Sequence, residues 1–127
     1  MLHPSLFIQA SEGRGRGVFT RDRLAEGTFL EVSPVLVLSN RERMEVEKTL
    51  LHDYVFEWGP DRAQCCVAWG YVSMYNHSEL PNCTYEMDFE AETIAIRTLR
   101  EIQVGEELLI NYLPEEGDKP AIWFEVK

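Results

Sequence analysis

The stretch SMYNHSELPNC, residues 73–83, follows an apolar and aromatic run and gathers polar and turn-forming residues. Three interpretations are open: a metal site, a nucleophile with its base, or a set of turns. A zinc site fails because His77 with Cys83 lacks a partner pair at usable spacing. Neighbouring side chains of an extended segment point to opposite faces, so His77 is poorly placed to serve Ser78 as a base. Taken alone, the stretch predicts turns closed by its polar side chains around Pro81.

The composition predicts one folded domain. The chain has 127 residues, 45% of them hydrophobic, which is room for one modest core. Its net charge of −10 argues against non-specific binding to nucleic acid, for which a basic face is the expected footprint. A cationic partner fits this charge, although an acidic surface that only keeps the protein in solution is the simpler interpretation.

The chain shows no targeting or membrane signal. No apolar run approaches the ~20 residues of a membrane span, and the N-terminus lacks the pattern of a signal peptide. We therefore expect a soluble, cytoplasmic protein without a membrane partner. Cys65, Cys66 and Cys83 are odd in number and poorly spaced for zinc, so we expect reduced thiols and no structural metal.

Short strand-like segments dominate the chain and predict a mostly β (α+β) fold. They lie at residues 5–10, 17–20, 28–39, 65–70, 83–99 and 106–113. Within 83–99, two alternating runs flank an acidic tip and predict a hairpin. Gly105 is expected to form the turn before the last strand.

One interruption is helical. From Asn40 as N-cap, residues 41–55 carry apolar residues at three- and four-residue intervals and predict a helix of about three turns, with Leu50, Leu51, Tyr54 and Val55 on its apolar face. The tail, residues 113–127, contains two prolines and a glycine and predicts an extended arm that wraps the domain.

Two further motifs flank the opening stretch. GRGRGVF, residues 13–19, has alternating glycines that let backbone amides approach a ligand, and two arginines that suit a carboxylate. Alone, it fits an ordinary glycine-rich turn equally well. VGEELLINY, residues 104–112, ends in Tyr112, which on its own fits core or edge packing.

Together, GRGRGVF, YNHSELPN and GEELLINY occur in the order and approximate spacing of one family. The chain resembles the SET domain of protein lysine methyltransferases from Ser5 to Tyr112, so we expect a SET domain at 5–112 and the arm at 113–127. Its compact form is similar to the small stand-alone SET proteins of bacteria and viruses. The resemblance implies several small curved sheets, a short helical insert and a C-terminal pseudoknot. It also implies transfer of a methyl group from S-adenosylmethionine to a lysine side chain.

The resemblance implies the following cofactor-binding residues: Arg14, Gly15, Arg16, Gly17, Asn76, His77, Tyr112 and Trp123. Backbone amides and a cation at the glycine-rich segment suit the methionine carboxylate of the cofactor. Asn76 and His77 would hold its amino group and adenine by hydrogen bonds, without acid or base chemistry. Tyr112 would be the catalytic residue, with its hydroxyl near the methyl group and the target nitrogen.

The substrate side of the site is expected to be aromatic. Lysine has a pKa near 10.4, so at pH 7 the neutral amine is only about one part in 10³ to 10⁴. An apolar channel and a nearby sulfonium cation both disfavour the charged ammonium. Tyr54, Phe56 and Trp58 are candidates for that channel, with simple core packing as the alternative for each. In the tail, Trp123 would cover the cofactor and Phe124 would lie near the channel.

The sequence departs from the family pattern at several positions. Val32 and Pro34 replace a tyrosine and a glycine, Ser73 and Met74 replace an Arg-Phe pair, and Glu79 replaces a cysteine. These departures leave a second interpretation open, a SET-like module that binds basic peptides without catalysis. A purely structural β domain is a third. The expected partner is a protein with a target lysine, basic or histone-like, and the protein is expected to be a monomer or homodimer.

Overall fold

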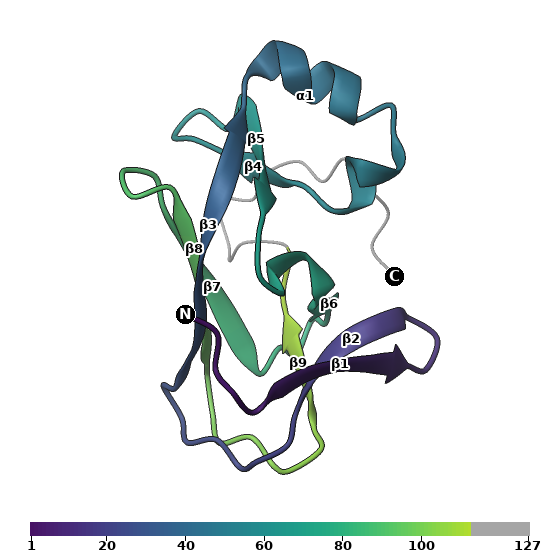
Figure 1. Cartoon of the computed structure of the whole chain (residues 1–127), viewed down its shortest axis with the longest axis vertical. Coiled ribbons are helices and arrows are strands. Elements are labelled where there is room, and N and C mark those ends of the chain that lie inside the picture. The colour runs from purple at the N-terminus through teal and green to yellow at the C-terminus, as the bar shows by residue number, and fades with distance from the viewer. Residues whose placement is uncertain (113–127) are drawn as a thin grey trace.

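The computed structural model describes residues 1–112, and strands make up most of its regular structure (Figure 1). In chain order the elements are β1 (Leu6–Ser11), β2 (Gly15–Thr20), β3 (Phe29–Leu38), α1 (Asn40–Val46), the 3₁₀ helix η1 (Leu50–Asp53), β4 (Phe56–Trp58), β5 (Gln64–Ala68), the 3₁₀ helix η2 (Val72–Met74), β6 (Asn76–His77), β7 (Cys83–Asp88), β8 (Thr93–Thr98) and β9 (Glu107–Ile110). The expected mostly β fold is confirmed.

The described strands form two sheets. One has the order β1-β2-β9-β6 and the other the order β4-β5-β3-β8-β7. All neighbours pair antiparallel except β6 and β9, which are parallel. The long strand β3 pairs with β8 along its first half and with β5 along its second. Figure 1 shows β3 running between the end that carries α1, β4 and β5 and the end that carries β1 and β2.

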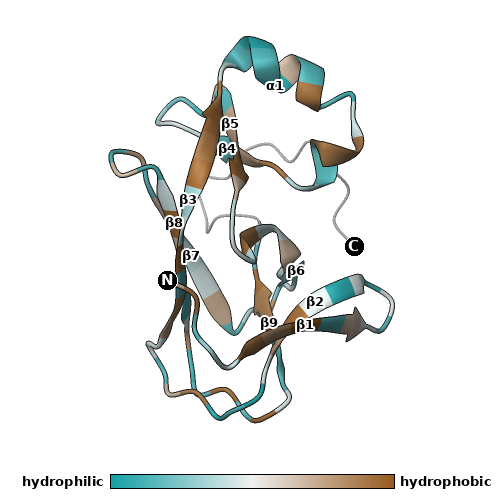
Figure 2. Ribbon diagram, in the orientation of Figure 1, coloured by the Kyte–Doolittle hydropathy of each residue, from teal (hydrophilic) through white to brown (hydrophobic). Residues whose placement is uncertain are grey.

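Both sheets contribute side chains to the core. Its fully buried aliphatic side chains include Val18, Leu30, Ile94, Ile96, Ile102, Leu108 and Ile110, drawn from both sheets and the loop before β9. Along β8 buried residues alternate with partly exposed ones, as expected for a strand with one face on the core. Figure 2 shows hydrophobic residues in β3 and β9, whereas α1 is mostly hydrophilic.

The predicted three-turn helix is wrong. Helix α1 spans seven residues, and η1 follows after a break at residues 47–49. The N-cap is Ser39, because its side chain accepts a hydrogen bond from Glu42 N while the Glu42 carboxylate accepts from Ser39 N. The supposed apolar face is largely in solvent: Leu50 is 81% exposed, and only Val55, beyond both helices, is buried.

The predicted hairpin and the predicted turn at Gly105 are both confirmed. Strands β7 and β8 form the expected hairpin, and Gly105 has φ 81° in the turn before β9, a conformation that glycine adopts readily. Ser78 Oγ accepts from Leu80 N, as expected of a turn-forming residue. Asn82 is different: its buried side chain donates to Glu107 O and accepts from Leu109 N. The Asn82 side chain therefore forms hydrogen bonds with the backbone of β9, which is distant in sequence, and does not only close its own turn.

The short pair β6 and β9 positions the site. Asn76 lies opposite Leu109 and His77 opposite Ile110, so the segment that begins at Asn76 runs beside the end of β9. This pairing brings the opening stretch of the sequence next to Tyr112, two residues beyond β9, as the expected SET topology requires.

Candidate active site

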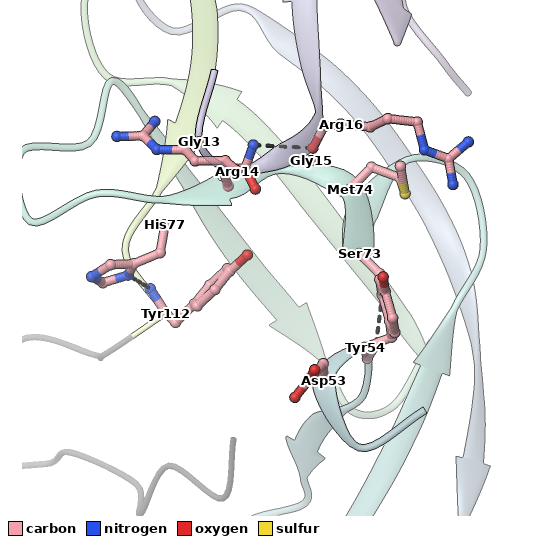
Figure 3. Close-up of a pocket in the computed structure, with 11 residues that line it drawn as sticks. Gly13, Arg14, Gly15, Arg16, Asp53, Tyr54, Ser73, Met74, His77 and Tyr112 are labelled. Carbon is pink, nitrogen blue, oxygen red and sulfur yellow. Dashed lines mark hydrogen bonds between the residues drawn. The ribbon is translucent and has the colours of Figure 1, made fainter. Parts of the chain in front are cut away.

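A pocket of about 410 Å³ lies between the β1–β2 loop, the end of η1, η2 and the end of β9. It is lined by Gly13, Arg14, Gly15, Arg16, Asp53, Tyr54, Ser73, Met74, Asn76, His77 and Tyr112. Figure 3 shows the glycine-rich loop along one side, Asp53 and Tyr54 on the opposite side, and the Tyr112 ring between them. Its volume falls within the range of about 300 to 1,000 Å³ that is typical of small-molecule sites.

Tyr112 is held by hydrogen bonds from its hydroxyl and backbone and by a ring contact. Its hydroxyl donates to Tyr75 O at 2.6 Å, its backbone N–H donates to His77 Nδ1 at 3.0 Å, and its ring lies 5.1 Å from the His77 ring. Burial raises the pKa of the Tyr112 phenol to about 12. The phenol therefore stays protonated at neutral pH, and its hydrogen is directed at the Tyr75 carbonyl.

His77 acts as a hydrogen-bond acceptor. Its Nδ1 receives the Tyr112 N–H, which requires that this nitrogen carry no proton. Burial lowers the pKa of the imidazole, and Arg14 adds to that lowering while Glu79 opposes it. The neutral ring is consistent with the structural role that the sequence predicted for His77.

The glycine-rich loop is shaped for close approach. Gly13 and Gly15 have φ of 75° and 78°, and a Cβ at either position would meet nothing within 4 Å. Gly17 is different, because a Cβ there would collide with the Glu107 carboxylate and lie 2.8 Å from Asn76 Nδ2. Gly17 does not line the pocket, but its missing side chain makes room for two residues behind it.

Glu107 contacts three residues beside the glycine-rich loop. Its Oε1 accepts from Ser11 Oγ at 2.8 Å and lies 3.7 Å from the Arg14 guanidinium, while its Oε2 accepts from Asn76 Nδ2 at 2.8 Å. Asn76 Nδ2 also donates to Arg16 O at 3.1 Å. Both amide hydrogens of Asn76 are therefore directed at protein acceptors, so the amide carbonyl is the group suited to receive a ligand ammonium.

Of the three aromatic residues predicted for the substrate channel, only Tyr54 lines the pocket. Tyr54 lines the pocket, and its carbonyl accepts from Ser73 Oγ at 2.8 Å. Phe56 lies in β4, away from the pocket lining, with its ring 6.0 Å from that of Tyr85. Trp58 is 3% exposed and stacks edge-on against Phe89, so it packs in the core.

The structure adds residues that sequence reasoning missed. Asp53, Ser73 and Met74 line the pocket, and Glu107 supports it from β9. Ser73 and Met74 replace an Arg-Phe pair of the family pattern. That difference was the only feature of the sequence that could have pointed to them as site residues. Glu107 lies within the quoted GEELLINY motif, yet only the pairing of β9 with β2 shows what it contacts. Trp123 and Phe124 lie outside the described residues.

The described part of the chain holds no group of three or more metal-binding side chains. No helix within residues 1–112 is long and apolar enough to cross a membrane.

Comparison with known proteins decides the family. The family profile of the SET domain matches residues 15–113. The chain belongs to the SET domain family. A "Histone-lysine N-methyltransferase, H3 lysine-37 specific" from Schizosaccharomyces pombe is 36% identical over 126 residues, which cover 98% of this chain and 80% of that protein.

A solved structure has the same fold as this SET domain. The crystal structure of a candidate histone methyltransferase from Plasmodium falciparum superposes with a TM-score of 0.70 at 24% identity, over 92% of this chain and 100% of that one. The predicted fold is therefore confirmed. The predicted family and enzyme class, methylation of lysine in a protein substrate, are confirmed by the family match and the 36% identical relative. The individual roles of the site residues stay predictions.

Proposed function

We propose that this SET domain binds S-adenosylmethionine in the pocket beside Tyr112 and methylates a lysine in a basic, histone-like segment. The observation that carries the proposal is the meeting of all three sequence motifs at one pocket: Arg14, His77 and Tyr112 come from segments far apart in the chain. The histone-lysine methyltransferase named above supports the choice of substrate. The net charge of −10 also favours a cationic substrate.

The residues present fit this cofactor. S-adenosylmethionine carries a carboxylate, an ammonium and a positively charged sulfur that supplies the methyl group. Arg14 is suited to the carboxylate, because it lines the pocket and its charge reaches His77, whose pKa it helps burial to lower. The Asn76 carbonyl is suited to the ammonium, since the amide hydrogens are directed at Arg16 O and Glu107.

Tyr112 orients the reacting groups and does not act as the base. With a pKa of about 12 the phenol holds its proton, and that proton is directed at the Tyr75 carbonyl at 2.6 Å. The hydroxyl therefore presents oxygen lone pairs to the pocket side, where they can accept hydrogen bonds from an amine or weak CH···O contacts from a polarised methyl. Such fixed dipoles are effective because they need no reorganisation during the reaction.

Loss of the lysine proton precedes transfer. Holding a lysine neutral at pH 7 costs about 4 to 5 kcal/mol if its pKa is unperturbed. His77 does not take this proton through Nδ1, since that atom accepts from Tyr112 N. We propose that the proton leaves to water, helped by the aromatic surface of Tyr54 and Tyr112.

The cytoplasmic location stays a prediction.

The test is methyl transfer from labelled S-adenosylmethionine to purified core histones, with the modified residue located by mass spectrometry. We expect label on lysine in the presence of the wild-type chain. An acidic protein of similar lysine content serves as the control and should remain unlabelled. Binding of a basic peptide that is indifferent to the cofactor, without any labelled lysine, would instead support the non-catalytic module.

A further inference from the structure

A fully buried carboxylate is linked to the pocket residue Tyr112 through Tyr75. Glu31, at the bulge near the start of β3, is 0% exposed, and among residues 1–112 it is the only Asp, Glu, Lys or Arg that is buried. Burial of a carboxylate is unfavourable unless donors satisfy it. What Glu31 contacts therefore indicates why it is there.

Three donors converge on Glu31. Its Oε1 accepts from Ser33 Oγ at 2.6 Å and from Tyr71 N at 3.1 Å, and its Oε2 accepts from Tyr75 Oη at 2.6 Å. The two hydroxyl contacts have the short length typical of bonds to a charged oxygen. The carboxylate thus links β3 to both ends of the segment 71–75.

The backbone is shaped around this carboxylate. Gly70 has φ 66°, and a Cβ there would collide with Glu31 Oε1 and with Ser33 Oγ. The chain can pass so close to Glu31 because position 70 has no side chain. From there η2 leads directly to Tyr75, whose side chain is 0% exposed.

Tyr75 joins the carboxylate to the pocket. Its hydroxyl donates to Glu31, and its backbone carbonyl accepts the hydroxyl of Tyr112, each at 2.6 Å. We propose that Glu31 is a positioning residue for the methyl transfer proposed above: it anchors Tyr75, and the Tyr75 carbonyl in turn fixes the direction of the Tyr112 hydroxyl. Burial and the charge of Glu31 raise the pKa of the Tyr75 phenol well above its usual value, so Tyr75 remains a donor.

Two substitutions test the link from opposite ends. Tyr75→Phe removes the anchoring hydroxyl but keeps the ring and the backbone carbonyl. Glu31→Gln keeps the shape of the side chain but replaces one acceptor oxygen with a donor group. Because small displacements of an orienting group slow a reaction strongly, we expect each variant to lower kcat roughly three- to tenfold, with KM for the peptide within about twofold. The double variant should be about as slow as the slower single variant.

Thr98→Val is the matched control. Thr98 is also 0% exposed, and its hydroxyl donates to Ala25 O and accepts from Thr28 N, so its loss disrupts a buried hydrogen-bond network of similar kind. Its partners lie outside the pocket lining. We expect Thr98→Val to lower Tm, as the other two variants do, and to leave kcat within about twofold of wild type.

The decisive comparison is made in a Tyr112→Phe background. If Glu31 and Tyr75 act through the Tyr112 hydroxyl, their substitution should change the residual rate there less than twofold. Equal losses in both backgrounds, or full activity of both variants, would overturn the proposal.

A second readout needs no activity. The ¹³Cζ resonance of Tyr112 reports the hydrogen bond of its hydroxyl, so we expect it to shift in Tyr75→Phe and Glu31→Gln and to stay in Thr98→Val. An unchanged resonance in all three would overturn the proposal even if one variant folds poorly. A wild-type chain without methyl transfer would refute the proposed function, whereas the resonance would still decide the role of Glu31.

Discussion

The Tyr112 hydroxyl donates to the Tyr75 carbonyl across 2.6 Å, although the two residues lie 37 positions apart. The pairing of β6 with β9 makes this contact possible, because it brings the segment after Tyr75 alongside the segment before Tyr112. The contact limits what Tyr112 can do, because its hydroxyl hydrogen is directed at the Tyr75 carbonyl.

The rate of methyl transfer should rise with pH from 6 to 9. The cause is the neutral fraction of the substrate lysine, whose ordinary pKa is about 10.4. Ionisation of Tyr112 cannot be the cause, since its pKa is raised to about 12. We therefore expect Tyr112→Phe to keep the same slope of log(kcat/KM) against pH at a lower rate. A slope that disappears in Tyr112→Phe would make the tyrosine the base.

Acidification should weaken the site through His77. Burial lowers the pKa of His77 below its ordinary value of 6.5, so the folded state binds its proton less readily than the unfolded state does. The stabilising contribution is therefore present above pH 6.5 and is lost as the pH falls through the lowered value. We expect Tm and cofactor affinity to decrease from pH 7 to pH 5, and to decrease less in His77→Asn, which keeps an acceptor without titrating.

Glu79 provides a matched check on that prediction. Its charge opposes the lowering of the His77 pKa. Glu79→Gln should therefore move the acid limb of the cofactor-affinity profile to lower pH. A movement to higher pH would contradict the assignment of this limb to His77.

Gly17→Ala should weaken cofactor binding although Gly17 does not line the pocket. A Cβ there collides with the Glu107 carboxylate and crowds Asn76 Nδ2. We expect a loss of affinity of roughly tenfold, measured by calorimetry with S-adenosylmethionine. Gly27→Ala is the control: its φ of 79° makes alanine unfavourable by about 1 to 2 kcal/mol, yet it meets no atoms within 4 Å. It should lower Tm and leave affinity unchanged.

Arg14→Ala should reduce cofactor affinity roughly tenfold, because charge-assisted hydrogen bonds contribute about 1.5 to 3 kcal/mol and this side chain is partly exposed. The difference from wild type should shrink as salt is added. Arg23→Ala removes an exposed arginine paired with Glu101 and should have no effect on affinity. Equal affinities of wild type and Arg14→Ala would show that another group holds the carboxylate.

Local patterns predicted the parts of the fold that depend on local chemistry. The hairpin β7–β8 and the turn at Gly105 follow from alternation and from glycine, and the structure has both. The helix was overestimated because its spacing continues past residue 46, whereas the Ser39 capping box and the break before η1 confine α1 to seven residues. The apolar residues of that spacing are then left mostly exposed.

Long-range contacts explain what the sequence could not predict. The motifs indicated Arg14, His77 and Tyr112, and these do line one pocket. Glu107 and Glu31 look like two acidic residues among 22, and only the folded structure shows that Glu107 contacts Asn76 and that Glu31 contacts Tyr75. Phe56 followed the same aromatic pattern as Tyr54, but strand β4 turns it toward Tyr85.

The role of Tyr112 in methyl transfer is tested most directly by the single-turnover rate with a histone peptide, compared between wild type and Tyr112→Phe, with S-adenosylmethionine affinity measured for both. We expect transfer to lysine by wild type and a rate reduced roughly 100-fold or more in the variant, at cofactor affinity within a few-fold. Equal rates for the two proteins, or no transfer by wild type saturated with cofactor, would contradict this role.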